Sequence, residues 1–331
     1  MYSDEDLNGA VDAGIFEANA VHQFRQHIAS TANINTVDEE NFRLLSGFND
    51  IFVLAASAIL LSSLAWLGFV IAPVLGAVLV AVGSWVLAEV FVRRKRMALP
   101  AIGLLLSFLG ALFAIPILAF EPVSEIQFVA AGVLATLGAF AHWRYFKVPI
   151  TLAAGLATLF LGVFGMLASF NEMSVQFYPQ YMIGAGIVTF LLAMYWDGTD
   201  PKRETRRSDV AFWLHLLSAP LIVHPIFSNL AVFSAIAEVG TSVLIFALYL
   251  LLALVSIAID RRAIMVSALA YVIYAISGLL ENAGLVSYSM AVTGTIIGGS
   301  LLLLSAYWQQ SRQFVVGLLP AKSKVYLPAL Q

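Results

Sequence analysis

Two histidines lie inside one long apolar run of the chain and are its first candidates for chemistry. His215 and His224 carry the side chain that ordinarily changes charge near neutral pH, so they could relay protons or contact a ligand. Pro220 and Pro225 accompany them and would free backbone carbonyls and bend the helix. Nine residues of ideal helix place the two imidazoles on opposite sides, which argues against one shared metal site. Separate hydrogen bonds in the helix core are the alternative.

Polar side chains recur at helical spacing in the three apolar runs that follow. They form three stripes: Ser242, Tyr249 and Ser256; Ser267, Tyr271, Tyr274, Gly278 and Glu281; and Ser289, Thr293 and Ser300. The stripes favour a polar path, whose candidate lining residues are His215, His224, Tyr249, Tyr271, Tyr274 and Glu281. The alternative is that they serve only hydrogen bonding between helices. Gly294 and Gly298 add a small-residue surface for close helix packing.

Basic residues cluster just before the run that contains the two histidines. Arg203, Arg206 and Arg207 are candidates for contact with anionic lipid headgroups, or with a phosphate that guanidinium groups would bind. Asp200 precedes a proline, and this pair predicts that a helix starts at Pro201.

Several functional classes lack support in the sequence. The chain has no cysteine, which excludes disulfides and thiolate metal sites. No catalytic motif, metal signature or nucleotide-binding loop stands out, so we predict no metal, no cofactor, no nucleic-acid partner and no assigned enzymatic activity. An intramembrane lipid-modifying enzyme would need an acid–base pair such as His215 with Asp209, and these lie about 120° apart on a helix.

Ten long apolar runs must position these residues. A hydrocarbon core about 30 Å thick requires roughly 20 helical residues. Apolar residues make up 61% of the chain and charged residues 11%, against roughly a quarter charged in soluble domains. The segments 130–140 and 153–164 resemble each other, which we attribute to common small and apolar residues. The predicted fold is an all-α polytopic transmembrane bundle with spans near 49–70, 74–94, 98–120, 125–143, 149–169, 179–196, 208–233, 239–259, 263–281 and 285–308.

The basic residues predict the orientation of the spans. All 17 Lys and Arg residues can be placed on one side of a membrane, because they occupy alternate connections and the two ends of the chain. Short loops rich in Lys and Arg stay in the cytoplasm, so we predict that both termini are cytoplasmic. Glu89 and Arg93, four residues apart at one of these ends, predict a surface ion pair.

The membrane domain is predicted to run over residues 49–312, with one segment before it. Residues 1–48 are polar and acidic and predict a cytoplasmic helical segment, whose first helix ends at Asp12 ahead of Gly14. About 50 residues with few large apolar groups make a poor independent core. We therefore expect this segment to pack on the membrane domain, on a second copy of the chain or on a cytoplasmic partner.

The segment after the membrane domain, residues 313–331, predicts an amphipathic cytoplasmic tail. An interfacial anchor is suggested by its apolar residues together with Arg312 just before it and Lys322 and Lys324 within it; the apolar residues are Phe314, Val315, Val316, Leu318 and Leu319. A loose tail is the alternative.

Parts of the chain resemble a known group of proteins. The runs DLNGAVDAGIFEANAVHQF at 6–24 and DEENFRLLSGFNDIFV at 38–53 resemble the start of uncharacterised bacterial inner-membrane proteins, in which a short cytoplasmic helical segment precedes eight or more spans. The tract TRRSDVAFWLHLLSAPLIVHP at 205–225 is similar to the same proteins. The ten-span plan with both ends inside is also similar to the drug/metabolite transporter superfamily. These resemblances imply a bacterial source and a multi-pass inner-membrane location, and they assign no reaction.

We therefore expect a multi-pass protein of the bacterial inner membrane that transports or translocates a small or amphipathic ligand along a polar path among spans seven to ten. A non-catalytic scaffold or sensor that recruits a partner through residues 1–48 is the alternative, and the lipid-modifying enzyme is a third. The expected partners are the lipid bilayer, anionic lipid headgroups at the cytoplasmic face, and a second copy of the chain or a cytoplasmic protein.

Overall fold

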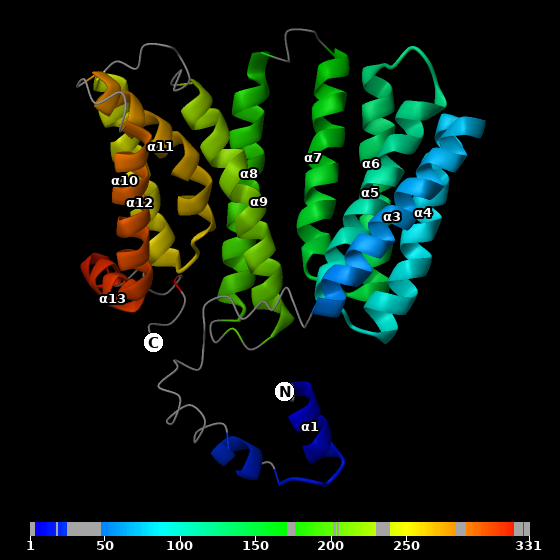
Figure 1. Cartoon of the computed structure of the whole chain (residues 1–331), viewed down its shortest axis with the longest axis horizontal. Helices are drawn as coiled ribbons and strands as arrows, with labels where there is room; N and C mark the ends of the chain where they lie inside the picture. The colour runs from blue at the N-terminus through cyan, green and yellow to red at the C-terminus, as the bar shows by residue number, and fades with distance from the viewer. Residues whose placement is uncertain are drawn as a thin grey trace. The chain divides into compact units, whose positions relative to one another are not determined.

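The computed structural model describes residues 4–17, 19–24, 48–170, 176–200, 203, 205–229, 239–282, 289–320 and 327. The chain divides into two compact units, residues 1–41 and 42–331. Within each unit the described residues are helical or irregular, and none of them forms a strand. Figure 1 shows the helices coloured in chain order.

The first unit contains helix α1, Asp4–Asp12. Its end agrees with the prediction, because Gly14 has a φ of +71°. Glycine adopts this left-handed conformation without strain, and helices commonly end in it. A short helix follows at residues 19–24. Phe16 and Phe24 are 49% and 53% exposed, so the described part of this unit presents apolar side chains on its surface.

The second unit is a set of long apolar helices at the positions of the predicted spans. They are α3 Phe48–Ile71, α4 Pro73–Ala88 with its π-helical continuation η1 Glu89–Arg94, α5 Ala98–Ala119, α6 Glu125–Phe146, α7 Ile150–Phe170, α8 Tyr178–Gly198, α9 Arg206–Asn229, α10 Val239–Ile259, α11 Ala263–Asn282, α12 Ser289–Ala306 and α13 Trp308–Leu318. Among the described residues, eight helices are long and apolar enough to cross a membrane, or up to nine if the bent pair α12–α13 counts as one span. The all-helical, multi-pass architecture is therefore confirmed.

The outer surface of this unit is apolar, as lipid contact requires. Helix α3 buries Val53, Ser57 and Leu61, which share one helix face, and turns much of its remaining surface outward. Trp66 and Ile71 on the same helix are 72% and 78% exposed. Soluble monomers rarely expose large contiguous apolar patches. The burial pattern thus indicates that lipid surrounds the helices.

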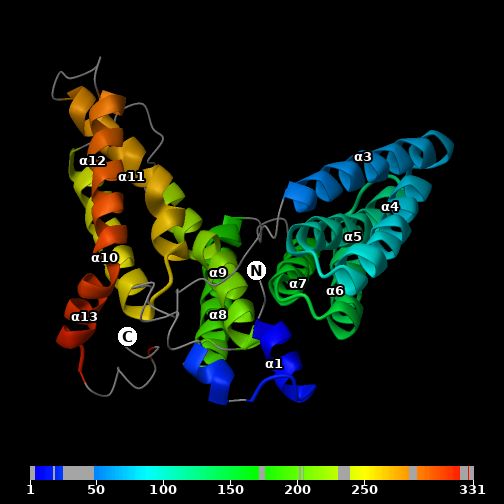
Figure 2. The same cartoon turned by 60° about the horizontal axis from the view of Figure 1, so that its bottom comes forward.

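Helices α6 and α7 pack backbone against backbone. They lie side by side in Figures 1 and 2, and a Cβ atom added at Gly132 would lie 2.3 Å from the Cα of Gly162. Small residues permit this approach, and dispersion contacts then hold the helices together in lipid. The predicted small-residue surface of α12 differs, because added Cβ atoms at Gly294 and Gly298 would meet no described atom within 4 Å.

The connections rich in Arg and Lys gather at one end of the second unit, which we call the basic end. The Arg93 side chain at the end of η1 contacts the Tyr145 hydroxyl of α6. The predicted Glu89–Arg93 ion pair is confirmed, with 3.2 Å between Oε1 and Nη1. The Arg262 guanidinium, between α10 and α11, lies 4.7 Å from the centre of the Trp308 ring. Figure 1 shows these connections along the lower edge of the helices.

Helix α13 leaves α12 at an angle of 80°. The turn comes at Tyr307, before the predicted boundary between the membrane domain and the tail at residue 312. Trp308, Arg312 and Val316 share one face of α13 and are buried, whereas Phe314 is 70% exposed. The Arg312 side chain therefore faces the other helices, and an anchor of this segment at the membrane surface stays a prediction.

Candidate functional site

A group of buried polar and charged side chains joins α8, α9, α13 and the connections between helices at the basic end. We call it the charge cluster, and its members are Asp197, Arg203, Ser208, His215, Asp260, Arg261, Trp308 and Arg312. Burying a charge is costly unless it is paired, so each charged member requires partners. Figure 2 turns the basic end toward the reader, with α8 beside α9.

Asp197, in the last turn of α8, is the first acidic centre of the cluster. Its Oδ1 accepts a 2.6 Å hydrogen bond from Arg261 Nη2. Its Oδ2 lies 2.9 Å from His215 Nε2 and 3.3 Å from Arg261 Nε. Arg261 Nη2 also donates to the Ser208 carbonyl oxygen at 3.4 Å. This one carboxylate therefore ties α8 to α9 and to the α10–α11 connection.

Asp260 is the second acidic centre and has a φ of +60°, a left-handed conformation that aspartate tolerates better than most residues. Arg203 Nη1 donates to its Oδ2 at 3.0 Å, and Trp308 Nε1 donates to its Oδ1 at 2.8 Å. Arg312 Nε lies 3.7 Å from the same Oδ1. Asp260 and its neighbour Arg261 thus bind different partners, so the α10–α11 connection links α13 with α8 and α9.

Asp200 organises the connection between α8 and α9. Its Oδ2 accepts hydrogen bonds from the Thr205 backbone N–H at 2.9 Å and from the Thr205 hydroxyl at 2.6 Å. The same hydroxyl oxygen accepts from the Arg207 N–H at 3.3 Å, as an N-terminal capping residue does. Helix α9 therefore begins at Arg206, and the predicted start at Pro201 is wrong because Asp200 and Thr205 form a turn instead.

The cluster combines arginines with aspartates where little water reaches them. The Arg203 side chain is 5% exposed, and desolvation by burial lowers the pKa of its guanidinium. Arg261 lowers this pKa further, while Asp260 raises it. Removing one partner of a buried ion pair typically costs about 3–5 kcal/mol, because the other charge is left uncompensated. Removing one charged member of the cluster should therefore destabilise the protein, because its partner would stay buried without an opposite charge.

A second polar contact lies further along α9. His224 Nδ1 hydrogen-bonds the Tyr271 hydroxyl of α11. The Tyr271 ring is buried and stacks on Phe227, with ring centroids 5.0 Å apart, while His224 is exposed. His215 and His224 thus belong to different sites, as their predicted placement on opposite helix faces requires.

The other predicted path residues do not gather around one point. Tyr249 packs against apolar clusters formed by α9 to α13, and Tyr274 is 39% exposed. Glu281 belongs to α11, but its side chain lies outside the described residues. The hydroxyls of Ser277 and Thr293, 3.3 Å apart, join α11 to α12. This last contact is interhelical hydrogen bonding of the kind that the alternative interpretation predicts.

The three arginines that were predicted to contact lipid headgroups have two environments. Arg206 and Arg207 are exposed at the start of α9, where headgroup contact remains a prediction. Arg203 is instead paired with Asp260 inside the charge cluster. His215 likewise has Asp197 as its acidic partner, and not the Asp209 that a lipid-modifying enzyme was expected to use.

Asp197, Arg261 and Arg312 are candidate functional residues that the sequence pattern did not reveal. Asp197 lies in the last turn of α8, Arg261 in the α10–α11 connection and Arg312 in α13, all at the basic end, where charged side chains ordinarily contact water or headgroups. A signal was nevertheless present, because Asp197, Asp200 and Asp260 are acidic residues that lie close to basic residues in the same connections. Opposite charges held at one end of a bundle can pair, but the partners depend on which helices become neighbours.

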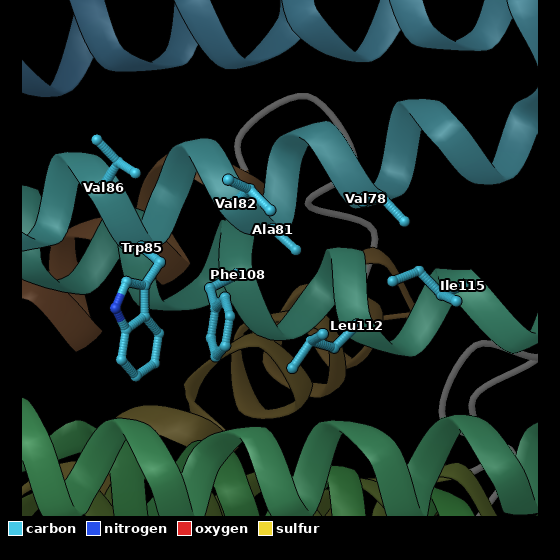
Figure 3. Close-up of a pocket in the computed structure, with 8 residues that line it drawn as sticks. All are labelled: Val78, Ala81, Val82, Trp85, Val86, Phe108, Leu112 and Ile115. Atoms are coloured by element: carbon cyan, nitrogen blue, oxygen red, sulfur yellow. The ribbon is translucent and has the colours of Figure 1, made fainter.

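A groove of about 350 Å³ lies on α4 and α5, helices that contribute nothing to the charge cluster. Figure 3 shows its lining, which is hydrophobic throughout: Val78, Ala81, Val82, Trp85, Val86, Phe108, Leu112 and Ile115. Val82 and Val86 are more than half exposed, so the groove opens on the apolar surface. It offers no group for acid–base or metal chemistry.

The charge cluster must be interpreted from its own geometry. Comparison with protein-family models, curated proteins and solved structures found no match to this chain. Among the described residues, no three His, Asp or Glu side chains are arranged to hold a metal ion. The chemistry that the cluster does supply is acid–base: an imidazole, two carboxylates and three guanidinium groups in contact.

Proposed function

We propose that this chain is a ten-span protein of a bacterial inner membrane that moves a small or amphipathic ligand along a polar path among α9, α10, α11 and α12. Both termini and the basic end would face the cytoplasm, following the preference of Lys and Arg for cytoplasmic loops. In this proposal the charge cluster closes the cytoplasmic end of the path.

The supporting observation is a succession of interhelical polar contacts along α11. The charge cluster adjoins its first residue, Ala263, and Tyr271 contacts His224 about 12 Å further on at 1.5 Å per residue. Ser277 contacts Thr293 about 21 Å from the same start. Ionisable and polar groups inside a membrane are costly, and they commonly mark the route of a substrate or a proton. Polar contacts at three depths along one helix support this route, and water access is what distinguishes it from interhelical packing.

Water access distinguishes a path from packing, and the absence of cysteine makes it measurable in the natural background. Single cysteines would replace Ser277 and Thr293, which contact each other between α11 and α12. Matched controls on the same helices are Val266→Cys and Ile296→Cys, at positions 59% and 53% exposed on the apolar surface. A charged thiol reagent requires water to form and reach a thiolate. We expect the path cysteines in membranes to react at least about tenfold faster than the controls, and equally slow reaction at all four positions would refute the path.

The same approach tests the orientation. Lys95→Cys lies at the basic end, and Val123→Cys lies in the connection between α5 and α6. In intact cells an impermeant reagent should label Val123→Cys directly and Lys95→Cys only after permeabilisation. The reverse pattern would place the basic end outside.

A scaffold or sensor is the second candidate, and the first unit supports it. Phe16 and Phe24 are about half exposed, which suits contact with a second copy or a cytoplasmic protein. Crosslinking of the full chain in membranes should give a defined adduct that Phe16→Asp abolishes. The matched change Phe314→Asp, at an exposed position of α13, should leave the adduct intact.

A further inference from the structure

The protonation of His215 follows from its contact with Asp197. An ionised carboxylate only accepts hydrogen bonds, so the imidazole Nε2, 2.9 Å from Asp197 Oδ2, must donate. A neutral imidazole then carries its lone pair on Nδ1. The His215 side chain is 0% exposed, and its Nδ1 has no hydrogen-bond partner among the described residues. His215 thus holds one vacant, buried proton acceptor.

The charges that face His215 come from three places. Asp197 belongs to α8, Arg261 to the α10–α11 connection and Arg203 to the α8–α9 connection. Helix α7 has no titratable residue, and the titratable residues of α11 are Tyr271, Tyr274 and Glu281. With a neutral imidazole, the negative charge of Asp197 is compensated by the positive charge of Arg261, and the ion pair between them stays intact.

We infer that His215 Nδ1 is a proton-binding site, and that proton binding releases Arg261 from Asp197 and opens the basic end. One proton from cytoplasmic water forms an N–H bond at Nδ1, the imidazole gains one positive charge, and no other covalent bond changes. This inference rests on the proposed function, to which it adds protons as the coupling ion.

Two positive groups would then share one carboxylate. His215 Nε2 and Arg261 Nε already approach the same oxygen, Asp197 Oδ2, at 2.9 and 3.3 Å. Like charges this close repel strongly where little water screens them. His215 is fixed within α9, whereas Arg261 belongs to a connection, so Arg261 is the group that can leave. Its neighbour Asp260 holds α13, so the connection and α13 would move together.

Ala211 reports directly on this opening. It lies between Ser208 and His215 on the same face of α9 and is 0% exposed. A single Ala211→Cys in the full chain, reconstituted in nanodiscs, would be titrated with a charged thiol reagent between about pH 8 and about pH 5. Thiol ionisation itself varies with pH, so each rate is divided by that of the exposed control Lys95→Cys at the same pH.

We expect the ratio to rise about tenfold or more as the pH falls, because a proton at Nδ1 makes His215 and Arg261 compete for the same Asp197 oxygen. His215→Gln, whose amide can still donate to Asp197, should keep the ratio low at every pH. Asp197→Asn should raise the ratio at every pH, because it releases Arg261 without a proton.

A flat ratio in the natural background overturns the inference even if His215→Gln does not fold, and so does a pH dependence that survives in His215→Gln. The Ser277→Cys and Thr293→Cys rates separate this result from the proposed function. If the path cysteines react rapidly while the Ala211→Cys ratio does not change with pH, the proposed path stands and the proton site at His215 is refuted.

Discussion

Helices α3 to α7 and helices α8 to α13 are held together by different kinds of contact. In α3 to α7 the helices meet through small residues, as at Gly132 and Gly162, and the ion pair Glu89–Arg93 is on the surface with side chains 29% and 53% exposed. In α8 to α13 the ion pairs are inside, and Asp197 and Asp260 each gather several donors.

The two kinds of contact differ in how readily they can exchange partners. Dispersion contacts between backbones fall off steeply with distance, so the α6–α7 contact has one good arrangement. A carboxylate with several donors can exchange them, and protonation can bias that exchange. The second region therefore carries the candidate site, and it is the region in which we propose a rearrangement.

The largest effect should come from breaking the charge cluster. Asp197→Ala leaves Arg261 buried without its carboxylate, which typically costs about 3–5 kcal/mol of unfolding free energy. Glu89→Ala, which removes the surface pair of the first region, should cost about 0–1 kcal/mol. Titration with denaturing detergent in mixed micelles measures both, and equal costs would remove the distinction between the regions.

Overpacking should be the most damaging change in the first region. Gly132→Ala puts a methyl group against the Gly162 backbone, and such insertions typically cost about 1–3 kcal/mol. Gly110→Ala on α5 is the matched control, since its new methyl group meets no described atom within 4 Å. Alanine there should be neutral or stabilising by up to about 1 kcal/mol, because it favours helix over glycine. The same detergent titration compares them, and an equal response would contradict close packing.

Loss of the His224–Tyr271 contact should have a smaller effect on stability. Tyr271→Phe removes only the hydroxyl that joins α9 to α11, and interhelical hydrogen bonds in membranes average about 0.6 kcal/mol, with a maximum near 1.7. Tyr249→Phe on α10 serves as the control, because Tyr249 is half-buried among apolar side chains, and its stability should change less. If Tyr271→Phe costs as much as Asp197→Ala, the second site is as essential to folding as the charge cluster.

The smallest effects sharpen the comparison. Ser277→Ala removes a hydroxyl contact in the second region and Thr136→Val removes its contact with Thr158 in the first. Each should cost about 0.6 kcal/mol, since neutral hydrogen bonds between helices are worth similar amounts wherever they lie. A difference above about 1.5 kcal/mol between the two variants would mean that hydroxyl contacts, and not only charges, distinguish the regions.

Most helices could be predicted from the sequence because lipid imposes one rule on every span. The predicted limits 98–120 and 239–259 compare with Ala98–Ala119 and Val239–Ile259 in the structure. A continuous apolar run in lipid must satisfy its own backbone hydrogen bonds, so it must be helical over its whole length. Where this rule weakens, at Pro201, the prediction of a helix start failed because Asp200 and Thr205 form a turn through their own hydrogen bonds.

The candidate site was predictable only in part. His215 and His224 were recognisable because ionisable residues inside an apolar run are unusual. Their partners were not, since Asp197 precedes His215 by a whole connection and Tyr271 lies two helices away from His224. The similar segments 130–140 and 153–164 show the same limit: their small residues were visible, but the contact between them follows from the antiparallel pairing of α6 and α7.

The sequence by itself determined that this chain is a bundle of membrane-spanning helices, which basic residues they carry at their ends, and that His215 and His224 lie within the same one. These properties depend on each segment's own transfer between water and lipid, which adjacent residues fix. Only the tertiary structure decided that Arg203, Arg261 and Arg312 turn inward to Asp197 and Asp260. A charge at a helix end can be neutralised by water, by a headgroup or by another side chain, and only the packing of distant helices selects among them.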